Sequence, residues 1–187
     1  MFLKRWCVNP RQLGAILPSS KALAKAMAEC ALEGRSPDEW IVELGAGTGR
    51  FTQALIEAGI PEERLLCIEI DPFLAEYLQE KFPKACVLTG NACYLEELME
   101  KHSGKNIRTI ISGLPMLNFP AVVQQKILRG CFHILKEEGQ FLQFSYSPFA
   151  SLSTSRFPLQ KRHRKMILLN FPPASIWSYT QKEDFFE

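Results

Sequence analysis

Ile41-Val42-Glu43-Leu44-Gly45-Ala46-Gly47-Thr48-Gly49 is a short apolar run that carries one acidic residue and continues as a row of alternating glycines. The apolar run predicts a buried strand. Glycine at every second position gives a backbone that can take positive φ and approach a ligand without an intervening Cβ. Residues 50–58 follow with apolar side chains at helical spacing, and Gly59 stands where a helix ends. We therefore predict a strand, a glycine turn and a helix whose N-terminal amide groups face a bound polar group.

The spacing of these glycines distinguishes two kinds of nucleotide site. A dinucleotide site has the pattern G-x-G-x-x-G, in which the third glycine lets the pyrophosphate sit over the helix. Here the third glycine comes only two positions after the second, which fits a pyrophosphate poorly. A turn that merely closes a strand-helix unit is the alternative. The pattern E-x-G-x-G-x-G resembles motif I of the class I S-adenosylmethionine-dependent methyltransferases. The resemblance implies a cofactor-binding set that includes Glu43, Gly45, Ala46, Gly47, Thr48 and Gly49.

A second acidic residue stands at the spacing expected for a nucleotide site. The apolar run at 65–70 predicts a buried strand that ends at Glu69, 24 positions after Gly45 (69 − 45). A carboxylate roughly 20 positions after the first glycine binds a ribose hydroxyl in nucleotide-binding βαβ units. A solvated acid at a strand end is the alternative. The methyltransferase resemblance adds Ile70, Asn91, Ala92 and Ser112 to the cofactor-binding set. The family usually has aspartate at the place of Asn91, and a neutral amide accepts a weaker hydrogen bond from the adenine amino group.

The loop after the predicted strand Ile107–Ser112 is the expected place for the acceptor. Loops at the carboxyl ends of central strands are where substrates meet cofactors in open α/β sheets. This loop has neither a histidine nor a carboxylate that could act as a base. We therefore expect desolvation and water to remove the proton of an attacking amine, and a backbone carbonyl and an aromatic ring to receive the developing positive charge. The catalytic candidates are Ser112, Gly113, Leu114, Pro115 and Tyr146.

The order of elements predicts an α/β fold. Strands at 41–44, 65–70, 85–88, 107–112 and 140–145 alternate with helical patterns, and a short connection between 165–170 and 175–179 can only join antiparallel neighbours. This is the layout of a Rossmann-like class I methyltransferase, with a mostly parallel seven-stranded sheet, helices on both faces and a C-terminal antiparallel hairpin. We expect a single domain over residues 1–187, in which residues 1–34 form an irregular segment and a helix that cover the site.

Three helices have recognisable boundaries or faces. Ser19 or Ser20 is a candidate N-cap for the helix that precedes the first strand. Asp71-Pro72 is a typical start for another, whose apolar stripe is expected at Leu74, Tyr77 and Leu78. A third has its apolar face at Val123, Ile127, Leu128, Cys131, Phe132 and Leu135, which places Gln124, Lys126, Arg129 and His133 on the solvated face.

Four further segments resemble the bacterial phospholipid N-methyltransferases. They are Gly14–Ser20, Ser112–Pro115, Phe144–Pro148, and Asn170–Ala174 leading to Trp177 and Tyr179. The resemblance implies methyl transfer from S-adenosylmethionine to the amino group of phosphatidylethanolamine, stepwise toward phosphatidylcholine, with S-adenosylhomocysteine as product. It also implies a phospholipid substrate and contact with an anionic membrane surface. Candidates for that contact are Phe2, Leu3 and Trp6 with Lys4 and Arg5, and the basic run Lys161–Lys165 near Phe149 and Phe157. A solvated charged face is the alternative.

Composition excludes several other classes. Of 187 residues, 47% are apolar and 22% charged, as in a globular domain, and a net charge of +2 gives little reason to expect nucleic acid. Six cysteines without metal-ligand spacing indicate reduced thiols and no metal site. The apolar run near the N-terminus is too short for a signal peptide, and glycine and prolines interrupt the longest uncharged stretch. We expect a cytoplasmic protein, peripheral at the inner membrane surface.

Three alternative functions follow from the same motifs. A ribosomal-RNA adenine dimethyltransferase has a similar glycine motif, but it reads its target with an Asn-Leu/Ile-Pro-aromatic loop, where this chain has Gly113 and Met116. A methyltransferase of soluble small amines would need the same pocket without the membrane contact. A non-catalytic module would bind the cofactor without transferring its methyl group.

Overall fold

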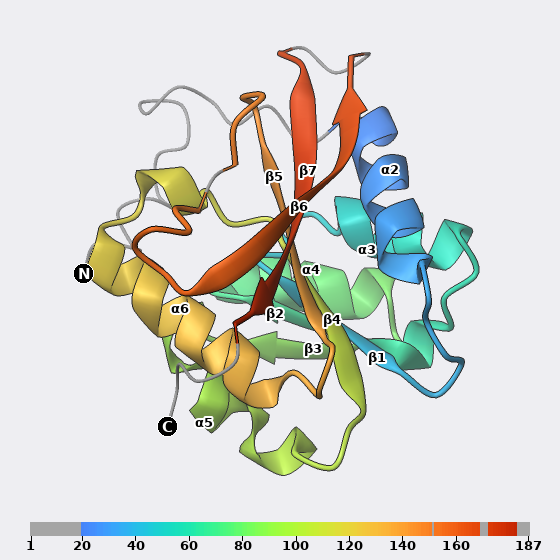
Figure 1. Cartoon of the computed structure of the whole chain (residues 1–187). Helices are drawn as coiled ribbons and strands as arrows, with labels where there is room; N and C mark the ends of the chain where they lie inside the picture. Colours follow the sequence, from blue (N-terminus) through green and yellow to red (C-terminus); the bar gives the residue numbers. More distant parts are fainter. Residues whose placement is uncertain (1–19, 151, 169–171, 183–187) are drawn as a thin grey trace.

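The computed structural model describes residues 20–150, 152–168 and 172–182. Within these ranges the chain forms one sheet of seven strands in the order β3-β2-β1-β4-β5-β7-β6. The strands are β1 (Trp40–Leu44), β2 (Leu65–Glu69), β3 (Cys86–Thr89), β4 (Ile107–Ser112), β5 (Gln140–Ser145), β6 (Leu159–Ile167) and β7 (Ala174–Gln181). The first five are mutually parallel, and β7 runs antiparallel to both β5 and β6. This is the predicted fold class (Figure 1).

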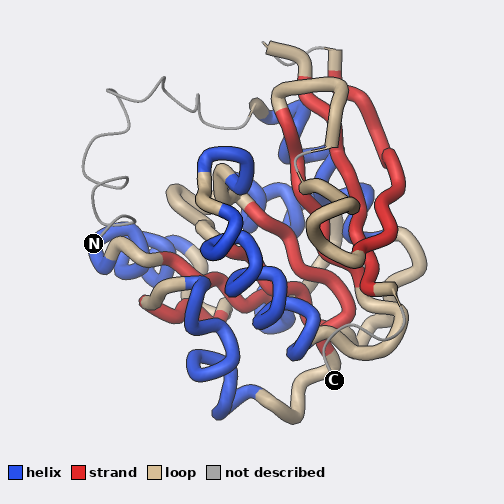
Figure 2. The backbone as a smooth tube through the Cα atoms, turned by 60° about the vertical axis from the view of Figure 1, so that its left-hand side comes forward, coloured by secondary structure: helices blue, strands red, loops and turns tan. Residues whose placement is uncertain are grey.

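Helices cover both faces of the sheet, as Figures 1 and 2 show. They are α2 (Lys21–Leu32), α3 (Arg50–Glu57), α4 (Pro72–Lys81), α5 (Leu95–Met99) and α6 (Ala121–Ile134). One buried cluster joins α2, α3 and α4 to alternate residues of the strands, such as Ile41 and Ile111. A second joins α5 and α6 to the intervening residues, such as Val42 and Ile110. Strands buried on both faces explain why the central strands are almost continuously apolar.

Capping residues fix the helix starts much as predicted. The Ser20 hydroxyl accepts a hydrogen bond from Leu23 N (3.1 Å) at the start of α2. Asp71 Oδ1 accepts from the amides of Phe73 (2.9 Å) and Leu74 (3.2 Å) at the start of α4. The predicted stripe of α4 was partly wrong, because Leu78 is buried with Ala75 whereas Tyr77 is exposed. The helix therefore buries a narrower face than its apolar residues suggest.

The predicted boundaries of the C-terminal hairpin were too short at both strands. β6 begins at Leu159 and so includes the whole basic run, and β7 ends at Gln181. β6 is the edge strand of the sheet, and most of its side chains are exposed. An exposed edge strand needs no apolar alternation, and lysine and arginine there discourage pairing with another sheet edge. The pattern of the sequence therefore gave no signal for the first half of this strand.

The remaining predictions concern the cysteines, metal binding, membrane-spanning helices and the N-terminal segment. Cys30, Cys67, Cys86, Cys93 and Cys131 are free thiols, and Cys7 lies outside the described residues. The described residues hold no cluster of three His, Cys, Asp or Glu side chains that could bind a metal ion. Among the helices described, none is both long enough and apolar enough to cross a membrane. The N-terminal segment and its aromatic and basic residues lie outside the described ranges.

Candidate functional site

The site lies where the strand order reverses. β2 and β4 flank β1 on opposite sides, so the loops that follow β1 and β4 leave the sheet edge in different directions and open a crevice between them. Backbone bonds hold these loops together. Gly45 N donates to Ile68 O (2.8 Å), and Gly113 N donates to Leu44 O (2.8 Å). These backbone hydrogen bonds therefore join the carboxyl ends of β1, β2 and β4.

The glycine loop has the left-handed backbone that its sequence predicts. Gly45 and Gly47 have φ of +69° and +56°, a region that other residues rarely adopt. A Cβ on Gly45 would lie 2.6 Å from Leu114 Cδ2, so this glycine makes room for the loop after β4. A Cβ on Gly47 would meet nothing within 4 Å. The space in front of Gly47 is therefore open to a ligand.

Glu69 connects the end of β2 to this loop. Its Oε2 accepts from Gly47 N (2.8 Å), and its Oε1 accepts from Asp71 N (3.0 Å). The side chain is buried, yet it reaches the wall of a cavity of about 240 Å³ beside the glycine loop. Each carboxylate oxygen keeps a free lone pair, so Glu69 can still accept from two vicinal hydroxyls of a ribose.

The cavity brings together most of the predicted cofactor-binding and loop residues. Its walls include Gly45, Gly47, Glu69, Ile70, Asn91, Ala92, Gly113, Leu114 and Pro115. They also include residues that the sequence analysis did not single out for the cofactor, namely Ile68, Asp71, Leu74, Gly90, Phe119 and Ile127. Four of these six are apolar, and an apolar wall suits the flat face of an adenine. Glu43, Ala46, Thr48, Gly49 and Ser112 do not line this cavity.

Asn91 has a structural role besides its place in the cavity wall. Its Oδ1 accepts from Cys93 N (2.9 Å) and so caps the turn η2 (Ala92–Tyr94). The Nδ2 amide makes no hydrogen bond with any described residue. An asparagine here therefore offers a ligand a donor as well as a remaining lone pair, whereas an aspartate would offer only acceptors.

Glu43 lies beneath the glycine loop instead of in the cavity wall. Its side chain is 2% exposed, and its Oε2 accepts from the Thr52 hydroxyl (2.6 Å) on α3. Its Oε1 is buried without a partner among the described residues. Burial and, to a smaller extent, the nearby Glu69 carboxylate raise the Glu43 pKa to about 8. Glu43 therefore links β1 to α3 through a buried hydrogen bond.

A smaller second cavity, of about 180 Å³, adjoins the first. The two share Gly113, Leu114 and Pro115, and the second is completed by residues of β5 and the segment after it, among them Phe144 and Tyr146. Their rings meet edge to face with centroids 5.3 Å apart. None of the described residues that line this cavity carries a carboxylate or an imidazole. The described lining of the second cavity therefore offers no carboxylate or imidazole base.

Gln143 is a polar residue of this cavity that the sequence did not indicate. It is 2% exposed, and its Nε2 donates to Leu114 O (3.0 Å) and Phe144 O (3.1 Å). Its Oε1 is buried without a partner in the described chain, as is the hydroxyl oxygen of Ser145. Buried acceptors are normally paired, and both residues line this cavity. A glutamine in an apolar strand pattern gives no signal of this role without the register of β4 and β5.

Other residues hold the loop between the two cavities. The Ser112 hydroxyl accepts from Leu114 N (3.2 Å), and Ser112 itself is fully buried, so it shapes the turn without lining either cavity. Gln124 was predicted on the solvated face of α6, and this was wrong. It is buried, and its Nε2 donates to Met116 O (2.8 Å) and Phe119 O (2.9 Å). These two bonds pair the buried amide with carbonyls of the loop after β4, which explains how a polar residue can be buried here.

Comparison with known proteins supports the methyltransferase fold. No family model matches the chain. It is 30% identical to the ornithine lipid N-methyltransferase of Singulisphaera acidiphila over 58% of this chain and 58% of that protein. It is 31% identical to the ribosomal RNA small subunit methyltransferase A of Chlorobium chlorochromatii over 59% of this chain and 37% of that protein. The matched regions thus span less than two thirds of either relative.

Solved structures of low sequence identity share the fold. A TehB-like SAM-dependent methyltransferase from Corynebacterium glutamicum is 16% identical, with a TM-score of 0.59 over 97% of this chain and 96% of that one. TrmN from Thermus thermophilus is 15% identical, with a TM-score of 0.64 over 87% of this chain and 49% of that one. The glycopeptide N-methyltransferase MtfA, solved with S-adenosylhomocysteine, is 14% identical, with a TM-score of 0.51 over 76% of this chain and 54% of that one. The fold is therefore that of S-adenosylmethionine-dependent methyltransferases.

Proposed function

We propose that this chain is an S-adenosylmethionine-dependent N-methyltransferase whose acceptor is the primary amine of a membrane lipid, with phosphatidylethanolamine as the first candidate. The observation that carries the proposal is the pair of adjoining cavities that share Gly113, Leu114 and Pro115. One has the carboxylate and open glycine loop that suit a nucleoside. The other offers buried acceptor atoms and an aromatic ring that suit an amine.

The residues present fit the cofactor. Glu69 would accept from the ribose hydroxyls, and Gly47 allows close approach because no side chain fills the space before it. Asn91 would contact the adenine edge, and apolar neighbours such as Leu74 and Ile127 would cover its faces. When bound, S-adenosylmethionine supplies a methyl group on a positively charged sulfur.

The second cavity would prepare the amine. A primary amine in water has a pKa near ~10, and transfer to a poorly hydrated cavity lowers it because burial disfavours the charged form. Gln143 Oε1 and Ser145 Oγ would accept its N–H groups and orient its lone pair. The Tyr146 ring would face the positive charge that develops on the nitrogen. With no carboxylate or imidazole among the described lining residues, water would carry the proton away.

A relative supplies a second candidate acceptor. The similar protein from Singulisphaera acidiphila is an ornithine lipid N-methyltransferase. Ornithine lipids, like phosphatidylethanolamine, present a primary amine, so both would use the same acceptors in the second cavity.

Gly113 argues against an RNA adenine as the acceptor. A Cβ at this position would lie 2.7 Å from Gly45 O, a backbone atom that cannot easily move. The asparagine with which the RNA adenine dimethyltransferases read their target would therefore not fit here without a shift of the glycine loop.

Membrane contact is part of the same proposal, and the structure limits which residues could make it. Phe149 is 76% exposed just beyond β5, whereas Phe157 is only 6% exposed and belongs to the core. Within the basic run, Lys165 pairs with Glu29 (2.5 Å) and Arg164 pairs with Glu33. Lys161 is exposed and remains available for an anionic surface, so we propose Phe149 and Lys161 as the contact residues among those described.

The decisive experiment measures transfer of labelled methyl from S-adenosylmethionine to four parallel acceptors. These are vesicles containing phosphatidylethanolamine, vesicles containing ornithine lipid, soluble ethanolamine and ribosomal RNA. Label in a lipid fraction supports the proposal and identifies the headgroup, and chromatography of the headgroups counts the methyl groups added. Label only in ethanolamine or only in RNA would refute the lipid acceptor. Cofactor binding without transfer to any of the four would indicate a non-catalytic binding module.

A further inference from the structure

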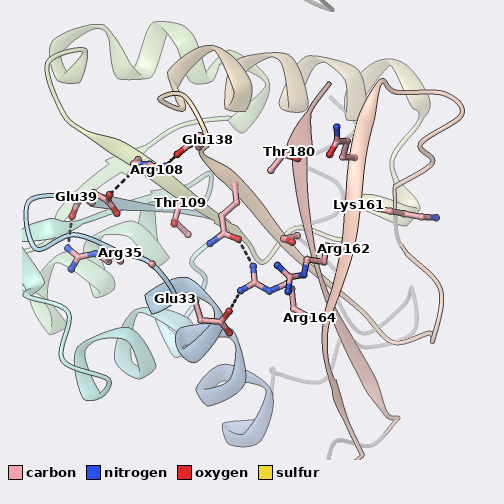
Figure 3. A pocket seen from close by; sticks show the side chains of 14 residues that line it. Glu33, Arg35, Glu39, Arg108, Thr109, Glu138, Lys161, Arg162, Arg164 and Thr180 are labelled. Atoms are coloured by element: carbon pink, nitrogen blue, oxygen red, sulfur yellow. Dashed lines mark hydrogen bonds and ion pairs between the residues drawn. The ribbon is translucent and has the colours of Figure 1, made fainter. Parts of the chain in front are cut away.

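A third cavity lies on the sheet face away from the cofactor crevice. It has a volume of about 550 Å³ and opens between the C-terminal end of α2 and the strands β4 to β7 (Figure 3). Its residues on β4 and β5 come from the first half of each strand, whereas the cofactor crevice lies at their carboxyl ends. A ligand here would not touch the reacting groups.

The floor of this cavity is polar where a sheet face is usually apolar. Strand register places Arg162 opposite Ser178, Gln160 opposite Thr180, and Thr109 beside Gln140. The hydroxyls of Thr109, Ser178 and Thr180 make no hydrogen bond with any described residue. A floor of free hydroxyls favours water or a polar ligand.

The cationic groups are arranged unevenly around the cavity. At one end Arg108 is neutralised by Glu138 (3.0 Å) and by Glu39 (3.7 Å). At the other end Arg162 and Arg164 both point into the cavity from β6, as Figure 3 shows, and face a single carboxylate, Glu33.

The two arginines differ in how they are held. The Arg164 side chain is only 10% exposed, Gln140 Oε1 accepts from its Nη1 (2.8 Å), and Glu33 accepts from its Nη2. A register shift between His163 and Lys165 places Arg164 in a β-bulge, and bulges commonly re-aim a side chain. Arg162 has no hydrogen bond or ion pair with any described residue. One guanidinium is therefore preorganised, and the other is free to close on an anion.

We propose that this cavity binds a small phosphorylated molecule, with its phosphate held between Arg162 and Arg164 and its hydroxyl groups on the polar floor. A guanidinium fork matches the oxygens of a phosphate, which carries about −1.5 to −2 charge at neutral pH when it is a monoester. Ligand pockets of about 300 to 1,000 Å³ hold molecules of this size. The site is independent of the methyl-transfer reaction proposed above.

The experiment is calorimetric titration of the full chain with pyrophosphate, without S-adenosylmethionine and at constant ionic strength. We expect saturable binding by the unaltered protein. Arg162→Gln is expected to weaken it about tenfold, because one charge-assisted pair is lost. Glu33→Gln is expected to strengthen it, because Arg164 loses its competing carboxylate. Loss of stability alone would not produce such a gain, so this variant separates a binding site from a structural cluster. Circular dichroism verifies the fold of each variant.

Lys161→Gln is the matched control. It removes the same charge from the neighbouring position of β6. Lys161 is among the residues that line the cavity, but Figure 3 shows its side chain pointing away from Arg162 and Arg164, and its Nζ lies 5.9 Å from the centroid of the Trp177 ring. Its affinity for pyrophosphate should stay close to that of the unaltered protein. Absence of saturable binding, or equal losses in Arg162→Gln and Lys161→Gln, would overturn the proposal. So would retention on phosphatidylglycerol vesicles that depends on Arg162 without any binding of pyrophosphate, since the cavity mouth would then belong to a membrane-facing surface.

Discussion

The buried Glu43 carboxyl gives the protein a predictable dependence of stability on pH. Thr52 donates one hydrogen bond to it, and its second oxygen has no partner in the described chain. Burial raises its pKa from 4.5 to about 8 in the folded state. Between these values the folded protein keeps a proton at Glu43 that the unfolded chain releases, so the free energy of unfolding falls as the pH rises. The stabilisation is complete below pH 4.5 and is lost on the way to pH 8.

The expected size follows from the width of that window. Each pH unit within it lowers the free energy of unfolding by about 1.4 kcal/mol. A rise from about pH 5.5 to about pH 7.5 should therefore lower it by roughly 2.5 kcal/mol through this one group. Glu43→Gln keeps the shape of the side chain and an acceptor for the Thr52 hydroxyl, but it has no proton to lose. The variant should therefore lack this component, and its stability relative to the unaltered protein should rise with pH.

Urea unfolding followed by circular dichroism at several pH values measures this difference. Glu57→Gln is the control, because Glu57 lies exposed on α3 and its replacement should leave the pH profile unchanged. If Glu43→Gln shifted the free energy of unfolding by the same amount at about pH 5.5 and about pH 7.5, the reasoning from burial would be refuted, since a neutral and a charged carboxyl could not then differ in cost.

Substitutions at three further positions test the site. Gly113→Asn puts a Cβ 2.7 Å from Gly45 O. Binding of S-adenosylmethionine, measured by calorimetry, should therefore weaken about tenfold or more. An unchanged affinity would show that the glycine loop can move to accommodate the new side chain. Gln124→Ala removes two hydrogen bonds to the loop after β4 and should lower the free energy of unfolding in urea by about 1 to 3 kcal/mol, whereas its exposed neighbour in Gln125→Ala should change it little. Tyr146→Phe keeps the ring and should retain most methyl transfer. Tyr146→Ala should lose about tenfold in kcat if the ring faces the positive charge that develops on the amine. An unaltered kcat in Tyr146→Ala would remove the ring from the mechanism.

The sequence predicts best where local chemistry decides the structure. Alternating glycines leave few options for the backbone of the loop after β1. Asp71-Pro72 starts a helix because the Asp71 side chain accepts hydrogen bonds from amides of the first turn and the proline ring suits the first helical position. The spacing of Glu69 predicted a position beside the glycine loop, and its carboxylate accepts from Gly47 N there. Prediction failed where a residue's role depends on its contacts with a part of the chain that is distant in sequence. Gln143 is a polar residue in an apolar strand, and Gln124 lies on a helix face that was predicted to be solvated. Only the folded loop after β4 presents the carbonyls that both side chains bind.

Strand alternation also explains where the structure places Glu43. As part of the motif it was assigned to the cofactor, but it lies between Val42 and Leu44, so its side chain points to the opposite face from theirs, toward α3. The edge strand β6 shows a different limit. Its side chains face solvent or pair with Glu29 on α2 and with Glu33 just after α2, far away in sequence, so no periodic pattern marks where it begins.

The two cavities at the carboxyl edge are one mechanical unit, because the same loop forms the wall between them. Gly113 N donates to Leu44 O at the base of the glycine loop, the missing Cβ of Gly45 makes room for Leu114, and Gln143 holds Leu114 O from β5. The wall is thus fixed by β1, β4 and β5 together. A methyl group and an amine must meet within a few tenths of an ångström of the reactive geometry, and sites on rigid elements hold such positions better than free loops do. Gln143 should therefore matter twice, since its Nε2 holds the wall and its Oε1 is the buried acceptor that we propose for the amine.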